Sequence, residues 1–171
     1  RLARILAAAG YKPIGLDHYA KPGDTLAEPG VRRNFQGYTT DAADALIGLG
    51  ASAIGFLPQG HVQNMPATGE YMRIVKEGKL AAVRGLEMDN DDRLRGAVIE
   101  RLMCDFGFSR AALCLRYGDA AQAIFKEADI LVAQGEFFER KGDRYEIKPD
   151  MRLFARQAAA ADGRFARHHA D

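Results

Sequence analysis

Apolar residues at the start of the chain recur with the period of a helix. The apolar positions, spaced i, i+3, i+4 and i+7, are Leu2, Ile5, Leu6 and Ala9. Gly10 follows them and is a typical helix stop, so the pattern predicts a helix over residues 1–9. Neither an initiator Met nor a capping residue precedes it, and we expect the chain to be a piece of a longer protein.

The next part of the chain alternates between apolar segments and polar ones. Residues 11–17 and 51–57 are short, mostly apolar runs and predict two strands. Between them lie a long polar loop, residues 18–40, and a predicted helix over residues 41–49. Apolar strands separated by a helix predict a parallel sheet with a crossover connection.

From residue 58 the pattern becomes mainly helical. Residues 59–66 are polar and predict a loop, and residues 68–76 predict a short helix. An extended segment is expected over residues 81–88, followed by a long amphipathic helix that opens at 89–92 and ends near Asp105. The apolar face of that helix comprises Leu94, Val98, Ile99, Leu102 and Met103.

The last 60 or so residues have the pattern of a small helical domain. A helix is predicted over residues 120–134, with apolar positions at Ile124, Phe125, Ala128, Leu131 and Val132. Residues 137–147 predict a hairpin around Gly142 and Asp143, and residues 149–161 predict a final helix. Helices followed by a two-stranded wing and a helix resemble a winged-helix arrangement.

Composition excludes several classes of protein. Lys and Arg total 24 against 23 Asp and Glu, a formal net charge of +1, which gives no reason to expect a nucleic-acid partner. No apolar run approaches the roughly 20 residues of a membrane span, so we expect a soluble chain. Cys104 and Cys114 lack the clustering of a disulfide framework or a zinc site, and we predict neither a metal ligand nor a catalytic residue in this chain.

The residues best suited to contact a ligand lie in the long loop, at positions 33–40. Phe35 offers a flat apolar face for an adenine or a tetrapyrrole, and Gln36 offers hydrogen-bond donors and an acceptor. Gly37 permits an unusual backbone conformation or a close ligand approach. The alternative is a loop packed onto its own domain through Phe35 and Tyr38.

Several motifs in this region resemble those of one enzyme family. In chain order they read Gly-Leu-Asp-His-Tyr-Ala at residues 15–20, Asn-Phe-Gln-Gly-Tyr-Thr-Thr at 34–40, Gly-Ala-Ser-Ala-Ile-Gly at 50–55 and Arg-Gly-Leu at 84–86. Together they resemble the oxygen-independent coproporphyrinogen III oxidases, radical S-adenosylmethionine enzymes of haem synthesis. The haem-chaperone paralogues typically show a His-Asn and Tyr-Trp pattern where this chain has residues 34–38, and this chain has no Trp.

The resemblance implies a fold of α/β class that becomes mostly α. Residues 1–58 would be the last strand-helix units of a partial TIM-like barrel, and residues 59–89 a connecting segment. Residues 90–171 would form a helical, winged-helix-like carboxy-terminal domain that covers the active site. Barrel enzymes build their sites at the carboxy ends of strands, where Asp17, His18 and Ile54 fall.

The resemblance also implies an activity, cofactors and site residues. The family decarboxylates two propionates of coproporphyrinogen III to vinyl groups in the cytoplasm, using S-adenosylmethionine and a 4Fe-4S cluster. Phe35, Gln36 and Ile54 would line a second S-adenosylmethionine pocket. The family's cysteine triad is absent, so we expect the cluster ligands in a missing amino-terminal barrel and an inactive fragment.

The roles of four further residues stay open at this stage. Arg32 or Arg33 is a candidate for pairing with a propionate, because Arg binds carboxylates through two parallel hydrogen bonds. Asp17 and His18 have no firm role, and a hydrogen bond from His18 to loop backbone is as reasonable as a contact with the substrate.

Two other functions compete with the oxidase hypothesis. One is a haem-binding chaperone of the same superfamily. The other is a winged-helix module for nucleic acid in residues 90–160, with a basic wing that comprises Arg140, Lys141 and Arg144. The acidic residues on or just before the helix that would enter the groove oppose it; these are Asp119, Glu127 and Asp129.

Overall fold

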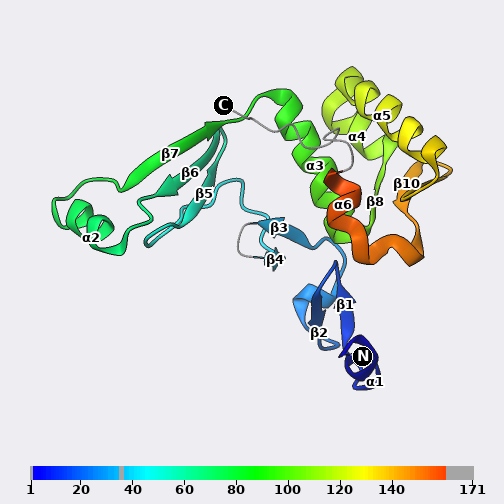
Figure 1. Cartoon of the computed structure of the whole chain (residues 1–171), viewed down its shortest axis with the longest axis horizontal. Helices are drawn as coiled ribbons and strands as arrows, with labels where there is room; N and C mark the ends of the chain where they lie inside the picture. Colours follow the sequence, from blue (N-terminus) through cyan, green and yellow to red (C-terminus); the bar gives the residue numbers. More distant parts are fainter. Residues whose placement is uncertain (1, 35–36, 161–171) are drawn as a thin grey trace. The chain divides into compact units, whose positions relative to one another are not determined.

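The chain folds into two compact units (Figure 1). The computed structural model describes residues 2–34 and 37–160. One unit combines residues 1–40 with residues 91–171, and the other comprises residues 41–90. These boundaries differ from the predicted domain boundaries. In the described parts of the chain, no helix has the length and apolar character needed to cross a membrane.

Short antiparallel hairpins build the amino-terminal part of the first unit. Its elements are α1 (Leu2–Ala8), β1 (Lys12–Ile14), β2 (His18–Ala20), the 3-10 helix η1 (Thr25–Ala27), β3 (Arg32–Asn34) and β4 (Gly37–Thr39). β1 pairs with β2, and β3 pairs with β4. The helix predicted over residues 1–9 is confirmed.

The strand predicted over residues 11–17 is only partly correct. The chain turns after Ile14, because Gly15 adopts a left-handed backbone with φ +51°, and it returns antiparallel as β2. All strand pairs in the described residues are antiparallel. The prediction of neighbouring parallel strands joined by a crossover helix is therefore wrong.

The carboxy-terminal part of this unit is mainly helical. Its elements are α3 (Asn90–Asp105), β8 (Gly107–Ser109), α4 (Arg110–Tyr117), η2 (Gly118–Ala120), α5 (Ala121–Gln134), β9 (Phe138–Lys141), β10 (Arg144–Ile147), η3 (Pro149–Phe154) and α6 (Ala155–Ala160). The strands form an antiparallel sheet in the order β8-β10-β9, with the helices gathered around it (Figure 1). The two long helices and the hairpin are as predicted, whereas β8 and α4 were not foreseen.

One hydrophobic core joins these helices to the sheet. Its fully buried large side chains are Leu94, Val98, Leu102, Phe108, Ile124, Tyr145 and Ile147. They come from α3, β8, α5 and β10, so the predicted apolar faces of both long helices are buried. The turn of the β9–β10 hairpin is also fixed, because Asp143 accepts hydrogen bonds from the Ser109 hydroxyl at 2.6 Å and the Ala111 amide at 3.2 Å. These bonds lower the pKa of Asp143.

The second unit is a small sheet with one helix. It contains β5 (Ile54–Leu57), β6 (Gly60–Asn64), α2 (Thr68–Lys76) and β7 (Ala82–Glu87). The strands run antiparallel in the order β5-β6-β7. The helix predicted over residues 68–76 and the extended segment near 81–88 are confirmed, but the loop predicted over residues 59–66 contains β6.

The helix predicted over residues 41–49 is wrong. Leu46 instead exchanges backbone hydrogen bonds of 2.7 and 2.8 Å with Phe56 on β5. A Cβ on Gly55 would lie 2.8 Å from the Leu46 carbonyl oxygen, so glycine at this position allows the two backbones to approach. Ile47 is 75% exposed and Leu49 is 86% exposed. A helix this short is stabilised mainly by burying an apolar face, and these side chains bury little.

Candidate functional site

The predicted cofactor residues divide between the two units and the undescribed part of the chain. Phe35 and Gln36 lie between β3 and β4 and outside the described residues. Ile54 is the first residue of β5, where it pairs with Gln63. It belongs to the unit of residues 41–90, so the grouping of Ile54 with Phe35 and Gln36 stays a prediction. What the structure describes is how the strands on either side of Phe35 and Gln36 are held.

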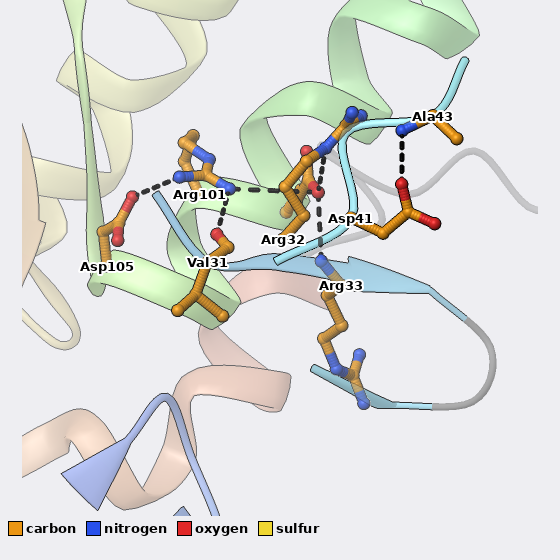
Figure 2. Close-up of polar contacts among 8 residues, drawn as sticks. Val31, Arg32, Arg33, Asp41, Ala43, Arg101 and Asp105 are labelled. Atoms are coloured by element: carbon orange, nitrogen blue, oxygen red, sulfur yellow. Dashed lines mark hydrogen bonds and ion pairs between the residues drawn. The ribbon is translucent and has the colours of Figure 1, made fainter. Parts of the chain in front are cut away.

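Side chains of helix α3 hold β3, and Figure 2 shows Arg101 bonded to Val31, the residue before the strand. One oxygen of Glu100 accepts a hydrogen bond from Arg32 Nε at 3.4 Å and another from the Arg33 backbone amide at 3.1 Å. On the next position of α3, the Arg101 guanidinium donates to the Val31 carbonyl at 2.9 Å. Side chains of the helix thus bind both the backbone and a side chain of β3.

Tyr38 on β4 makes the second connection to α3. Its hydroxyl accepts a hydrogen bond from the Leu16 amide at 2.9 Å and donates one to the Met103 carbonyl at 3.0 Å. Burial raises the pKa of Tyr38, which keeps the hydroxyl protonated and able to donate. A Cβ on Gly15 would lie 2.2 Å from this hydroxyl, so the turn after β1 leaves room for Tyr38 only because it contains glycine.

Polar side chains surround the Tyr38 ring. The His18 ring meets it edge-on with 4.9 Å between centroids, and the Arg33 guanidinium lies 5.7 Å from its centroid. His18 Nδ1 is 2.8 Å from the Asp17 carboxylate, which also lies 4.0 Å from Arg156. Asp17, His18 and Arg156 are each at least half exposed. We call Asp17, His18, Arg33 and Tyr38 the Tyr38 cluster.

Neither Glu100 nor the Tyr38 hydroxyl was predicted as part of this site. Their partners lie 65 to 68 residues away along the chain, except for Leu16, which is 22 residues from Tyr38. The pattern of hydrophobic and polar residues within a short segment does not reveal such pairs. The alternative from the sequence was a loop packed onto its own domain through Phe35 and Tyr38. The partly buried position of Tyr38 agrees with it, and Phe35 lies outside the described residues.

The two cysteines do not fit an iron–sulfur cluster, whose ligands are several converging thiolates. Cys104 lies on α3 and is half-buried, whereas Cys114 lies on α4 and is exposed. Burial raises the pKa of the Cys104 thiol to about 11, so it is protonated at neutral pH. Across residues 2–34 and 37–160, no group of three or more His, Cys, Asp or Glu side chains is placed to hold a metal ion.

The basic residues of the β9–β10 hairpin are paired with acidic ones. Arg140 lies 3.6 Å from Asp129, while Lys141 and Arg144 lie 3.3 Å and 3.1 Å from Glu146. A wing that contacts nucleic acid uses its cations to bind phosphates. The pairing therefore weighs against a nucleic-acid interface at this hairpin.

Comparisons with known proteins identify the relatives of the chain. No protein-family model matches it. It is 44% identical to the oxygen-independent coproporphyrinogen III oxidase of Bradyrhizobium diazoefficiens over 94% of the chain and 37% of that relative. It is 38% identical to the enzyme of the same name from Paracoccus denitrificans, over 91% of the chain and 36% of the relative.

A solved structure agrees with these relatives. The coproporphyrinogen III oxidase of Escherichia coli, described as a radical SAM enzyme, matches 92% of the chain with a TM-score of 0.80 and 30% identity. The match covers 38% of that structure, so the chain spans little more than a third of the length of its relatives. Sequence and structure together show that this chain belongs to the family of oxygen-independent coproporphyrinogen III oxidases.

Proposed function

We propose that the complete polypeptide containing this chain decarboxylates coproporphyrinogen III without oxygen. Each of two propionates would lose a hydrogen atom from its β-carbon to a 5′-deoxyadenosyl radical, then release carbon dioxide and pass one electron to an electron acceptor. The products are vinyl groups, and the tetrapyrrole becomes protoporphyrinogen IX. The observation that carries the proposal is 44% identity to a coproporphyrinogen III oxidase over 94% of the chain. The reaction would serve haem synthesis in the cytoplasm.

The proposed cofactors are S-adenosylmethionine and a 4Fe-4S cluster, which together would supply the hydrogen-abstracting radical. The cluster ligands would lie in the sequence that the longer relatives have and this chain lacks, because its two cysteines do not fit a cluster. We further propose that Phe35, Gln36 and Ile54 line an S-adenosylmethionine pocket. The bonds from α3 to β3 and β4 support this proposal, because these two strands flank Phe35 and Gln36 in the chain.

The finer description of the fold also belongs to the proposal. Residues 1–58 would be the carboxy-terminal end of a partial TIM-like barrel in the longer protein, residues 59–89 would connect, and residues 90–171 would cover the active site. The three-stranded sheet with its β9–β10 hairpin, packed on helices, supports a winged-helix-like description of the last part. The rest of the barrel would come from the remaining sequence of the complete polypeptide, since the described strands of residues 1–58 form short antiparallel ladders.

Replacing Gln36 by Ala should impair the use of S-adenosylmethionine. Loss of a hydrogen bond to a charged ligand corresponds to a decrease in affinity of about 10-fold or more. The measurement is carbon dioxide released by the reconstituted complete polypeptide, titrated with S-adenosylmethionine under anaerobic conditions. Gln122, an exposed residue of α5, provides the matched control, and its replacement by Ala should change nothing. If carbon dioxide release by the Gln36→Ala variant depends on S-adenosylmethionine concentration as in the wild type, Gln36 does not line the pocket.

A haem-binding chaperone remains the competing function within this superfamily. It predicts tight haem binding and no carbon dioxide from coproporphyrinogen III. The same titration distinguishes the two, because a chaperone would show no turnover at any concentration of S-adenosylmethionine.

A further inference from the structure

The Tyr38 cluster contains the Arg33 guanidinium, which forms no ion pair with a carboxylate among residues 2–34 and 37–160. We infer that Arg33 binds a carboxylate of the tetrapyrrole substrate, and that this carboxylate belongs to a propionate that the reaction retains. The inference rests on the proposed function. Neighbouring arginines have different surroundings.

Three arginines near β3 and β4 already have carboxylate partners. Arg32 lies 3.4 Å from Glu100, Arg101 lies 2.7 Å from Asp105, and Arg156 lies 4.0 Å from Asp17. In the described part of the chain, no carboxylate forms an ion pair with the Arg33 guanidinium. Its guanidinium lies over the face of the Tyr38 ring.

The strand geometry explains this difference. Successive side chains of a strand point to opposite faces, and Figure 2 shows Arg32 and Arg33 leaving β3 in opposite directions. Arg32 reaches the Glu100 carboxylate, whereas the Arg33 guanidinium lies beside the Tyr38 ring. The backbone of Arg33 is nevertheless fixed, because its amide donates to Glu100 at 3.1 Å. Arg33 thus combines a held backbone with an exposed guanidinium.

The Tyr38 ring orients that guanidinium. The Arg33 Cζ lies 5.7 Å from the ring centroid, within the range of a cation–π contact. Tyr38 is itself held by its bonds to Leu16 and Met103. A stacked guanidinium keeps its planar edge free for a bidentate bond to a carboxylate. Since fewer side-chain conformations remain to be lost on binding, this arrangement favours affinity.

The position of Arg33 in the chain fits a substrate carboxylate. It lies two residues before Phe35, which we place in the S-adenosylmethionine pocket, so a propionate bound at Arg33 would be close to the reacting region. His18 on the other strand pair also borders the Tyr38 ring, with Nδ1 engaged by Asp17. The carboxylate of Asp17 makes this side of the ring less favourable to an anion, and it points to Arg33 as the binding group.

The chemistry selects a retained propionate. A reacting propionate must lose its carboxylate as neutral carbon dioxide, and an ion pair that stabilises the starting carboxylate would raise the barrier to that step. Protoporphyrinogen IX still carries propionates. An ion pair with one of them stabilises the bound substrate and the transition state equally, so it does not raise the barrier. Arg33 would therefore determine the orientation of the tetrapyrrole and leave the reacting propionates unpaired.

Binding of two stable porphyrins to the complete polypeptide tests the inference. Coproporphyrin III carries both kinds of propionate, and mesoporphyrin IX carries only the retained ones. Replacing Arg33 by Gln should lower the affinity for both porphyrins by the same factor, about 10- to 100-fold, because a charge-assisted bidentate contact is lost. Arg33→Lys keeps the charge and should lose less. Affinity for S-adenosylmethionine and the unfolding temperature should stay unchanged.

Arg116 supplies the matched control. Its guanidinium lies 5.3 Å from the Tyr117 ring centroid on α4, so Arg116→Gln removes a similar contact and should leave both affinities unchanged. Equal affinities in wild type and Arg33→Gln would overturn the inference, and weakening of coproporphyrin III alone would overturn the assignment to a retained propionate. Carbon dioxide release from coproporphyrinogen III tests the proposed function separately: a wild-type protein that releases none would overturn that function, and one that releases it but binds neither porphyrin would overturn the inference alone.

Discussion

Replacing Gly15 by Ala is expected to destabilise the first unit by about 3 kcal/mol. The new Cβ would lie 2.2 Å from the Tyr38 hydroxyl, at a residue with φ +51°. Tyr38 would have to move and lose its bonds to Leu16 and Met103. About 1 kcal/mol for the backbone and about 1 kcal/mol for each hydrogen bond give the total. Urea denaturation followed by circular dichroism measures the change, and exchange of the Leu16 amide should accelerate.

Gly142 separates the steric effect from backbone strain. It has a similar φ of +58°, but a Cβ placed there would meet no atom within 4 Å. Gly142→Ala should therefore cost only about 1 kcal/mol. Equal losses of unfolding free energy in the two variants would mean that the close approach of Gly15 and Tyr38 does not affect stability.

Replacing Glu127 by Ala is expected to lower the free energy of unfolding by about 2–3 kcal/mol. The buried Arg95 of α3 bonds Glu127 of α5 at 2.8 and 2.9 Å and Asp91 at 2.9 Å. Burial lowers the pKa of Arg95, but the bonds to these two carboxylates outweigh it, so the pKa lies above its usual value. Removing one partner of a buried pair leaves a charge without full compensation. The surviving bond to Asp91 limits the loss.

The variant Arg95→Met tests the explanation. It removes the charge together with the need for partners and retains apolar volume, so it should cost less than Glu127→Ala. Urea denaturation of both variants gives the comparison. A larger loss for Arg95→Met would show that the ion pair is a net source of stability.

The parts of the fold that follow from local pattern were predictable from the sequence. The faces of α3 and α5 repeat apolar residues over about three turns, and the β9–β10 hairpin has its turn residues in place. Residues 41–49 also look helical locally, yet Leu46 pairs with Phe56. The backbone pairing of Leu46 with Phe56 determined the conformation of residues 41–49. The pattern within those nine residues does not reveal this pairing.

The site divides in the same way. Phe35 and Gln36 were chosen from residue type and resemblance, and their role stays a proposal. The residues that hold β3 and β4 in place were not predictable, since Glu100 and Met103 reach them from α3. The distinction between Arg32 and Arg33 also needed the structure. Adjacent arginines look equivalent in a sequence, and only the position of Glu100 shows which one is already paired.

The most direct test of this account is an anaerobic assay of the complete polypeptide, reconstituted with iron and sulfide. Coproporphyrinogen III, S-adenosylmethionine and an electron source are supplied, and carbon dioxide and tetrapyrrole products are measured. The account predicts two carbon dioxide molecules for each protoporphyrinogen IX, and none when residues 1–171 are assayed alone. Stable haem binding without carbon dioxide release from the complete polypeptide would contradict it and favour the chaperone function.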